Sequence, residues 1–171
     1  MDDAVARAMR RWPDVPGIAG YLSLDQRGNW RLQDRIIDHP RTIAFINRNY
    51  HAEADGRWFF QNGPQRAYVR LAYTPWVYRW STQGLQTHTG LPVTGPRSAW
   101  VDELGHLLIE SEHGIGVVDD RHLAALAEHI DSHEGSGNDA SATLHVHDVH
   151  LPLNPVNSAD VAGLFGFNPD P

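Results

Sequence analysis

The sequence predicts an α+β protein: two related β-rich units, each closed by a helix, joined by an antiparallel aromatic meander. Short runs of alternating apolar and polar residues, bounded by glycine and proline, recur along the chain and predict strands. Two stretches with helical spacing follow such strands, near residues 40–50 and 119–130. The similar order of turn, strands and helix at both places indicates an internal duplication, with coincidence of common turn motifs as the alternative.

The composition excludes several functions. A net charge of −7 argues against binding to nucleic acid polymers or anionic membranes, and no membrane-spanning run or signal peptide is recognised, so we expect a cytoplasmic protein. The absence of cysteine excludes thiolate nucleophiles and thiolate metal sites. The absence of lysine excludes Schiff-base catalysis and a Walker phosphate loop, so we expect no cofactor, and an anion site would use arginine, histidine or backbone amides.

Residues 12–55 are expected to form the first unit. Strands are predicted at 20–24 and 30–32, on either side of a turn that begins at Asp25. Asp38 is the expected N-cap of the following helix, because a carboxylate accepts hydrogen bonds from the free amides of a first helical turn. The apolar stripe of this helix consists of Ile43, Ile46 and Tyr50.

Residues 56–171 are expected to hold the central meander, the second unit and a docked C-terminal tail. The meander consists of runs at 57–61, 66–73 and 76–80, which carry three of the six tryptophans. An Asn-Gly pair between the first two runs predicts a tight hairpin turn. Thr74-Pro75 predicts a bend before the third run, since proline cannot donate to a sheet ladder.

The second unit repeats the first at a nearly constant offset. Asp102 lies 77 residues after Asp25 in a similar turn, and Asp119 lies 81 residues after Asp38 at the start of the second helical stretch. A polar linker at residues 133–141 follows that helix.

Five segments carry a resemblance to known proteins: WPDVPGIAGYLSLDQRGNWRL, HPRTIAFINRNY, DGRWFFQNGPQRAYVRLAYTPWVYRW, THTGLPV and FGF. By these segments the chain resembles a proteobacterial family of unknown function. More distantly, it is similar to another bacterial family of unknown function. That resemblance implies duplicated α+β domains, a second half superficially like a pleckstrin-homology barrel, and a ligand site between the halves. Neither family implies a catalytic residue.

An arginine face in the meander predicts a site for a small anionic ligand. Arg66 and Arg70 alternate with Tyr68 on one side of a strand, and arginine beside aromatic surface suits a nucleotide-like anion. The candidate ligand-binding residues are Gln65, Arg66, Arg70, Trp76, Thr87 and His88. We expect them to line a cleft between the two units. The alternative is a solvated outer face of the meander.

Histidines near the end of the chain are weak candidates for a metal site. His145, His147 and His150 have a spacing that metal sites use, with the first two on one face of a strand. His129 and His133 are neighbours on the preceding helix, so a shared site needs the linker to fold back. The alternative is a surface cluster.

Catalysis has little support in the sequence. Ser111, Glu112 and His113 are adjacent, and the members of a triad normally converge from separate elements. Asp119 and Asp120 are explained as helix-start residues. No nucleophile elbow or dinucleotide fingerprint is present, so we assign no catalytic residue.

We therefore expect a non-enzymatic cytoplasmic module that binds a small ligand or a protein partner, with a regulatory role. The chain has six tryptophans, and tryptophan is enriched in binding hot spots, so a protein partner is one alternative. Core packing explains most of these tryptophans. The alternatives are an enzyme of unrecognised mechanism that uses histidine and carboxylates, or a His-cluster metal-binding protein. The sequence does not determine the oligomeric state.

Overall fold

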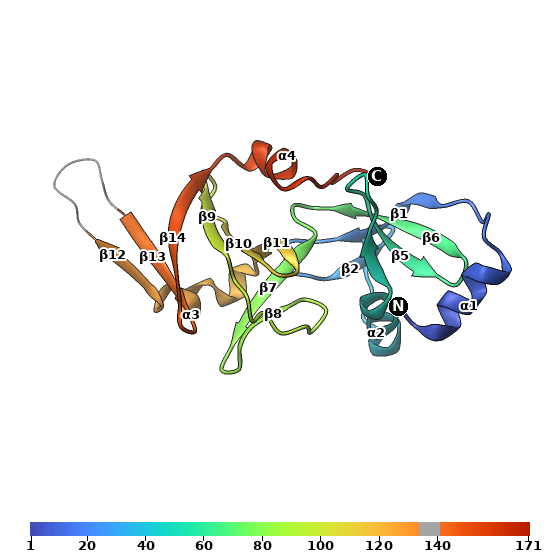
Figure 1. Ribbon diagram of the computed structural model, residues 1–171, viewed down its shortest axis with the longest axis horizontal. Coiled ribbons are helices and arrows are strands. Elements are labelled where there is room, and N and C mark those ends of the chain that lie inside the picture. Colours follow the sequence, from blue (N-terminus) through green and yellow to red (C-terminus); the bar gives the residue numbers. More distant parts are fainter. Residues whose placement is uncertain (134–140) are drawn as a thin grey trace. The chain divides into compact units, whose positions relative to one another are not determined.

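The computed structural model describes residues 1–133 and 141–171, which form two compact units (Figure 1). The first unit comprises residues 1–25, 29–75 and 166–171, and the second comprises 26–28 and the described part of 76–165. The division falls at Pro75 and not at residue 55, because the strands that follow residue 55 pair within the first sheet. The predicted polar linker lies almost wholly outside the described residues.

The first unit contains a mixed six-stranded sheet in the order β3-β2-β1-β6-β5-β4. Neighbouring strands are antiparallel, except that β1 and β6 are parallel. The strands are β1 (Ile18–Leu24), β2 (Trp30–Leu32), β3 (Arg35–Ile36), β4 (Tyr50–Ala52), β5 (Trp58–Asn62) and β6 (Gln65–Leu71). The helices are α1 (Asp3–Arg11) and α2 (Pro40–Arg48).

The second unit contains a mixed eight-stranded sheet in the order β12-β13-β14-β9-β10-β11-β7-β8, in which β14/β9 and β11/β7 are the parallel pairs. The strands are β7 (Trp76–Ser81), β8 (Gly84–Thr87), β9 (Ser98–Asp102), β10 (Leu107–Ser111), β11 (Gly114–Val118), β12 (Ile130–His133), β13 (Ser141–Val146) and β14 (Val149–Val156). Short 3₁₀ turns η1 (Asp120–His122) and η2 (Ser158–Asp160) precede helices α3 (Leu123–Ala127) and α4 (Val161–Phe165). The α+β class is thus confirmed, and no helix in the described ranges is long and apolar enough to cross a membrane.

The two sheets share one order of connection. In the first, β1–β2–β3 form an antiparallel meander, α2 follows, and β4–β5–β6 form another whose last strand is parallel to β1. In the second, β9–β10–β11, α3 and β12–β13–β14 repeat this arrangement, and β14 is parallel to β9. The helix therefore lies between two meanders. The sequence had predicted that the helix closes each unit, and this part of the prediction is wrong. Hairpin β7–β8 is additional and pairs with β11.

The expected continuous aromatic meander is wrong. β5–β6 and β7–β8 are both antiparallel hairpins, but they belong to different sheets. Strand β6 ends at Leu71 and β7 begins at Trp76, with Pro75 in the intervening segment. Each of β6 and β7 instead takes a parallel partner that is distant in sequence.

The turns that begin at Asp25 and Asp102 have the same geometry. Asp25 Oδ1 accepts from the Asn29 amide at 2.9 Å, and Asp102 Oδ1 accepts from the His106 amide at 2.8 Å. Asn29 Nδ2 then donates to Asp25 Oδ2 at 3.0 Å, while His106 Nδ1 lies 2.8 Å from Asp102 Oδ2. Each aspartate also donates its own amide to the carbonyl four residues on, at 3.1 Å in both turns.

Asp102→Ala is expected to lower the free energy of unfolding by about 2–3 kcal/mol, because it removes a carboxylate with several hydrogen bonds whose donors would lose their partner. The matched change Asp25→Ala should cost about 1 kcal/mol, because the Asp25 side chain is 21% exposed, whereas that of Asp102 is fully buried. Urea unfolding of both variants measures the difference. Equal losses would contradict it.

The expected helix caps are correct in one unit only. Asp119 accepts from the Arg121 amide at 3.1 Å and so caps η1. The N-cap of α2 is His39, with no side-chain cap bond, so Asp38 does not have the predicted role. Helix α2 also ends before Tyr50, which starts β4 and donates its hydroxyl to the Pro75 carbonyl.

Candidate ligand site

A pocket of about 780 Å³ lies in the second unit and is called here the His–Trp pocket. It is formed by the β7–β8 turn, helix α3 with the residues that follow it, and the end of β13. The lining residues are Trp80, Ser81, Thr82, Gln83, Gly84, Ala125, His129, His145 and His147.

Local hydrogen bonds shape the β7–β8 side of the pocket. Ser81 Oγ accepts from the Gln83 amide at 3.2 Å and donates to the Gly84 carbonyl at 3.2 Å. Gly84 has φ +98°, in the region that a side chain rarely adopts, which lets the two-residue turn close. The turn therefore holds Trp80, at the end of the hairpin, in a fixed position.

His147 lies against this turn from the β13–β14 connection. The sequence had predicted that His147 lies on a strand. Instead, β13 ends at Val146, and His147 has a φ of +53°, in the left-handed region. A Cβ on Gly84 would lie 2.5 Å from His147 Cε1, so only glycine allows the imidazole this approach. Two positive-φ residues thus meet at one wall of the pocket.

The indole of Trp80 lies beside the rings of two histidines of the lining. The Trp80 indole lies 4.9 Å from the His129 ring and 6.3 Å from the His147 ring, measured between centroids, with tilted planes. The backbone amide of His145 donates to the carbonyl of His129 at 2.8 Å, which brings the end of α3 beside β13. The lining thus combines one indole with the imidazoles of three histidines.

The histidines do not form the predicted metal site. His145 Nε2 lies 3.0 Å from Asp131 Oδ2, and its ring lies 4.4 Å from that of His150 on the paired strand. Within residues 1–133 and 141–171, no group of three or more His, Asp or Glu side chains has an arrangement that could hold a metal ion. His145 and His147 line the pocket, whereas His150 does not.

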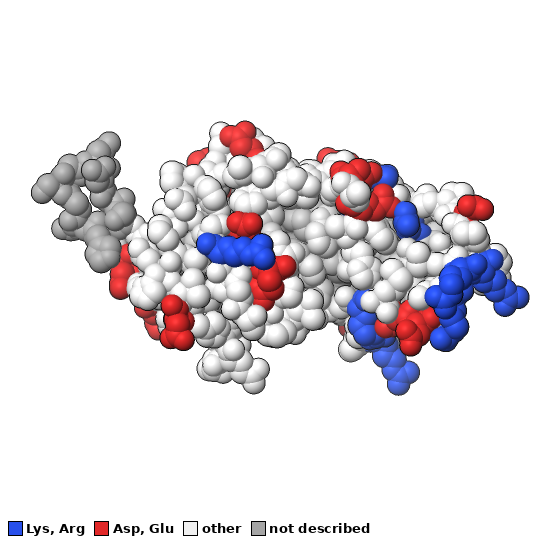
Figure 2. Space-filling model, in the orientation of Figure 1, with Lys and Arg blue, Asp and Glu red and all other residues white. Residues whose placement is uncertain are grey.

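Carboxylates already occupy the arginine face predicted as an anion site. Glu53, with a side chain only 16% exposed, accepts from Arg66 Nη1 at 2.6 Å, from Arg57 at 2.9 Å and from the Tyr68 hydroxyl at 3.1 Å. Arg70 lies 3.4 Å from Asp34, with both side chains largely exposed. On the face shown in Figure 2, basic groups likewise lie close to acidic ones.

The six predicted ligand residues divide between the two units. Gln65 lies on β6 with the two arginines, and its amide reaches the Pro16 carbonyl at 3.5 Å. Thr87 and His88 lie in the second unit with Trp76. Thr87 Oγ1 accepts from the Leu91 amide at 3.0 Å, so it serves a local turn.

His88 is a core residue. Its side chain is 6% exposed, its ring lies 5.6 Å from that of Trp76, and its Nδ1 accepts from the Val77 amide at 3.3 Å. Burial, and secondarily the positive charge of Arg79, lowers the pKa of His88 to about 3. His88 is therefore neutral near pH 7 and stabilises β7.

The adjacent residues Ser111, Glu112 and His113 form a structural turn. Ser111 Oγ lies 2.7 Å from the buried Tyr78 hydroxyl and accepts from the His113 amide at 3.0 Å. Burial alone would raise the pKa of Glu112, but backbone hydrogen bonds, among them those from Thr94 and Gly95, lower it to about 2. These polar groups bond to other groups of the protein and hold the turn.

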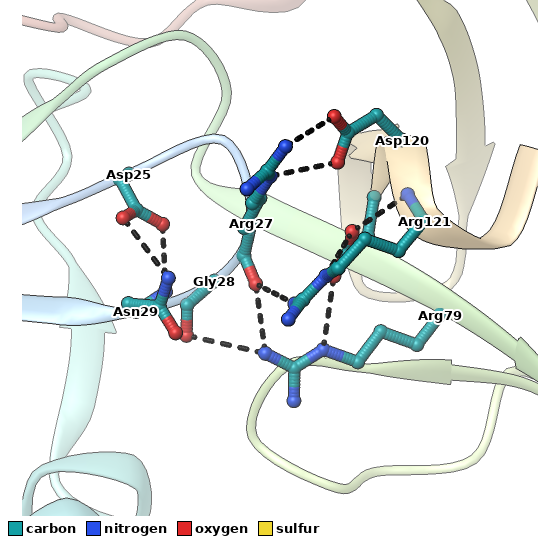
Figure 3. Close-up of polar contacts among 8 residues, drawn as sticks. Asp25, Arg27, Gly28, Asn29, Arg79, Asp120 and Arg121 are labelled. Atoms are coloured by element: carbon teal, nitrogen blue, oxygen red, sulfur yellow. Dashed lines mark hydrogen bonds and ion pairs between the residues drawn. The ribbon is translucent and has the colours of Figure 1, made fainter. Parts of the chain in front are cut away.

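Figure 3 shows a cluster of three arginines and two aspartates in the second unit. Arg27 makes a bidentate pair with Asp120 at 2.8 and 2.7 Å. Arg79 and Arg121 donate to the carbonyl of Arg27 at 2.8 and 3.3 Å, and both lie beside the carboxylate of Asp119. Because each guanidinium has a protein acceptor, the cluster fixes residues 26–28 and presents no free cation to a ligand.

Sequence reasoning noted the histidines of the pocket but missed Trp80 and Gly84. The signals for the histidines were the spacing of His145, His147 and His150 and the four-residue separation of His129 from His133, and a site joining the two sets required the chain to fold back. The antiparallel pairing of β12 and β13 provides that return. Trp80 has no sequence signal that separates it from the core tryptophans.

The described residues form an α+β protein with two mixed sheets and an open pocket in the second unit. The chain belongs to a family of proteins of unknown function (DUF2946), whose model matches residues 1–171. The predicted resemblance to a family of unknown function is thereby confirmed.

Two solved structures, both of DUF1285 family proteins, are similar to the chain. The protein from Silicibacter pomeroyi DSS-3, at 2.50 Å resolution, matches with a TM-score of 0.57 and 16% identity, covering 91% of this chain and 97% of that one. The protein from Shewanella baltica OS155, at 1.40 Å, matches with a TM-score of 0.30 and 11% identity over 86% and 92% of the two chains. The first likeness supports the fold alone. A comparison with curated proteins finds no match.

Proposed function

We propose that the protein is a non-enzymatic, cytoplasmic module that binds a small molecule in the His–Trp pocket. The observation that carries this proposal is the convergence of Trp80 with His129 and His147 around a space of about 780 Å³. Small-molecule sites of about 300–1,000 Å³ typically combine aromatic walls with a few polar groups.

Two hairpin turns position one wall of the pocket. His147 has a positive φ in the two-residue turn between β13 and β14, and its imidazole contacts Gly84, whose φ is also positive. The local geometry of both turns therefore places the imidazole of His147 beside Trp80.

Accessible polar groups also support this choice of site. His129 and His147 are exposed residues whose side chains line the pocket. A neutral imidazole offers one donor and one acceptor. A ligand in the pocket would therefore find polar groups within reach.

We also infer that the chain arose by an internal duplication, as the sequence indicated. The repeated unit is a meander, a helix and a second meander, and not the predicted strand–strand–helix unit. Support comes from the shared strand order and from the matching turns at Asp25 and Asp102. The module then consists of two related halves, of which the second contains the pocket.

A fragment screen by ligand-observed NMR tests the proposed function. Aromatic fragments should bind the wild-type protein, and Trp80→Ala should weaken them about tenfold, because an aromatic pair contributes beyond its buried area. Trp12→Ala is the matched control, since Trp12 is a half-exposed tryptophan of the first unit. Binding that survives Trp80→Ala, or a screen without binders, would overturn the proposal.

A further inference from the structure

We infer that the His–Trp pocket recognises an uncharged, planar heteroaromatic ring with both hydrogen-bond donors and acceptors, and not a phosphorylated nucleotide. This inference rests on the proposed function and names the class of its ligand. It replaces the nucleotide-like anion expected from the arginine face.

The first argument is charge. Among the described residues, the lining contains no arginine, aspartate or glutamate, and the chain has no lysine. A phosphate normally requires charge-assisted hydrogen bonds, most often bidentate ones from arginine. The arginines of the cluster in Figure 3 already pair with Asp119 and Asp120, and the net charge of −7 further disfavours an anion.

The second argument is shape. The indole of Trp80 offers a flat face on which a planar ring can stack, and stacking on tryptophan does not require a charged ligand. The rings of His129 and His147 lie beside it at 4.9 and 6.3 Å. An aliphatic ligand of the same volume would leave these flat surfaces poorly filled.

The third argument is hydrogen bonding. The imidazoles of His129 and His147 each supply one donor and one acceptor, the Thr82 hydroxyl supplies both, and the Gln83 amide adds two donors and an acceptor. A purely apolar ring would displace water from these groups without giving them hydrogen-bond partners, which disfavours binding. A heteroaromatic ring with N–H and carbonyl or ring-nitrogen groups at its edge satisfies them.

Matched pairs of probes that differ only in a phosphate test the inference. Adenosine and AMP, uridine and UMP, and riboflavin and FMN are titrated calorimetrically near pH 8, where free imidazole is neutral. At least one uncharged member should bind, and at least tenfold more tightly than its phosphorylated partner. Inorganic phosphate and Zn²⁺ alone should give no saturable heat.

Two variants connect binding to the pocket. Trp80→Ala should weaken the preferred probe roughly 5- to 150-fold, the range for one aromatic–base stack, while Trp80→Phe should retain most of the affinity. His147→Asn should weaken it as well without unfolding the turn, because asparagine tolerates positive φ. Trp12→Ala again serves as the control.

The outcomes separate the two proposals. A phosphorylated probe that binds more tightly than its uncharged partner, or saturable binding of phosphate or Zn²⁺ in the pocket, would overturn the ligand class. Failure of all three uncharged probes, while aromatic fragments still bind in a Trp80-dependent way, would overturn the class and leave the proposed function standing. Failure of both probes and fragments would remove both.

Discussion

Asp119→Ala is expected to lower the free energy of unfolding by about 3 kcal/mol, because it breaks a buried ion pair by removing one partner. The Asp119 side chain is fully buried and accepts from Arg121 Nε at 2.9 Å, while Arg79 Nε lies at 3.6 Å. Burial alone would raise the pKa of Asp119, but the bonds from Arg121 and the charge of Arg79 lower it, so the carboxylate is ionised when folded. Its removal leaves Arg79, only 29% exposed, without that counter-charge. Urea unfolding followed by circular dichroism measures the loss.

The neighbouring Asp120 provides the matched control. Its pair with Arg27 has good bidentate geometry, but both side chains are 55% exposed. Exposed pairs contribute about 0–1 kcal/mol, so Asp120→Ala should have a small effect that salt reduces further. If the two alanine variants lost the same stability, burial would not be the deciding factor in this cluster.

Acidification is expected to destabilise the protein through His88. The pKa of His88 is about 3 in the folded protein, whereas that of an exposed histidine is 6.5, so the unfolded chain binds one more proton than the folded protein between these pH values. The stabilisation is complete above pH 6.5 and is lost progressively as the pH falls from 6.5 toward 3. Between pH 6.5 and pH 4.5 the loss should be about 2 kcal/mol, because the slope approaches its full value of about 1.36 kcal/mol for each pH unit only below pH 6.5.

His88→Asn isolates this contribution. The asparagine Oδ1 can replace Nδ1 as acceptor of the Val77 amide, but the side chain does not titrate. The variant should be less stable at neutral pH because it leaves a cavity, yet lose about 2 kcal/mol less on acidification to pH 4.5 than the wild type. His39→Asn, at an exposed histidine, should leave the acid loss in place. An unchanged acid slope in His88→Asn would contradict the assignment.

The sequence predicted those parts of the fold that depend on local chemistry. The turns at Asp25 and Asp102, the Asp119 cap and the hairpin after Asn62 follow from side-chain and glycine preferences within a few residues. It did not predict the parallel pairs β1/β6, β11/β7 and β14/β9, because alternation identifies a strand but not its partner. The break of the meander near Pro75 follows from those unpredicted pairs.

The candidate site was harder to predict for the same reason. Arg66 and Arg70 are ordinary candidates for an anion site until Glu53 and Asp34 are brought beside them by the sheet. The φ of His147 is set by the β13–β14 connection and by its contact with Gly84, which lies far away in sequence. The sequence therefore identified the histidines as candidate site residues, but it could not predict how they are arranged in space.

The additional hairpin β7–β8 breaks the correspondence between the two halves of the chain. It supplies Trp80 and Gly84, and no strand pair in the first sheet corresponds to it. The proposed duplication consequently does not entail two equivalent binding sites. The proposed function therefore implies one ligand molecule for each polypeptide, because Trp80 and Gly84 have no counterpart in the first sheet.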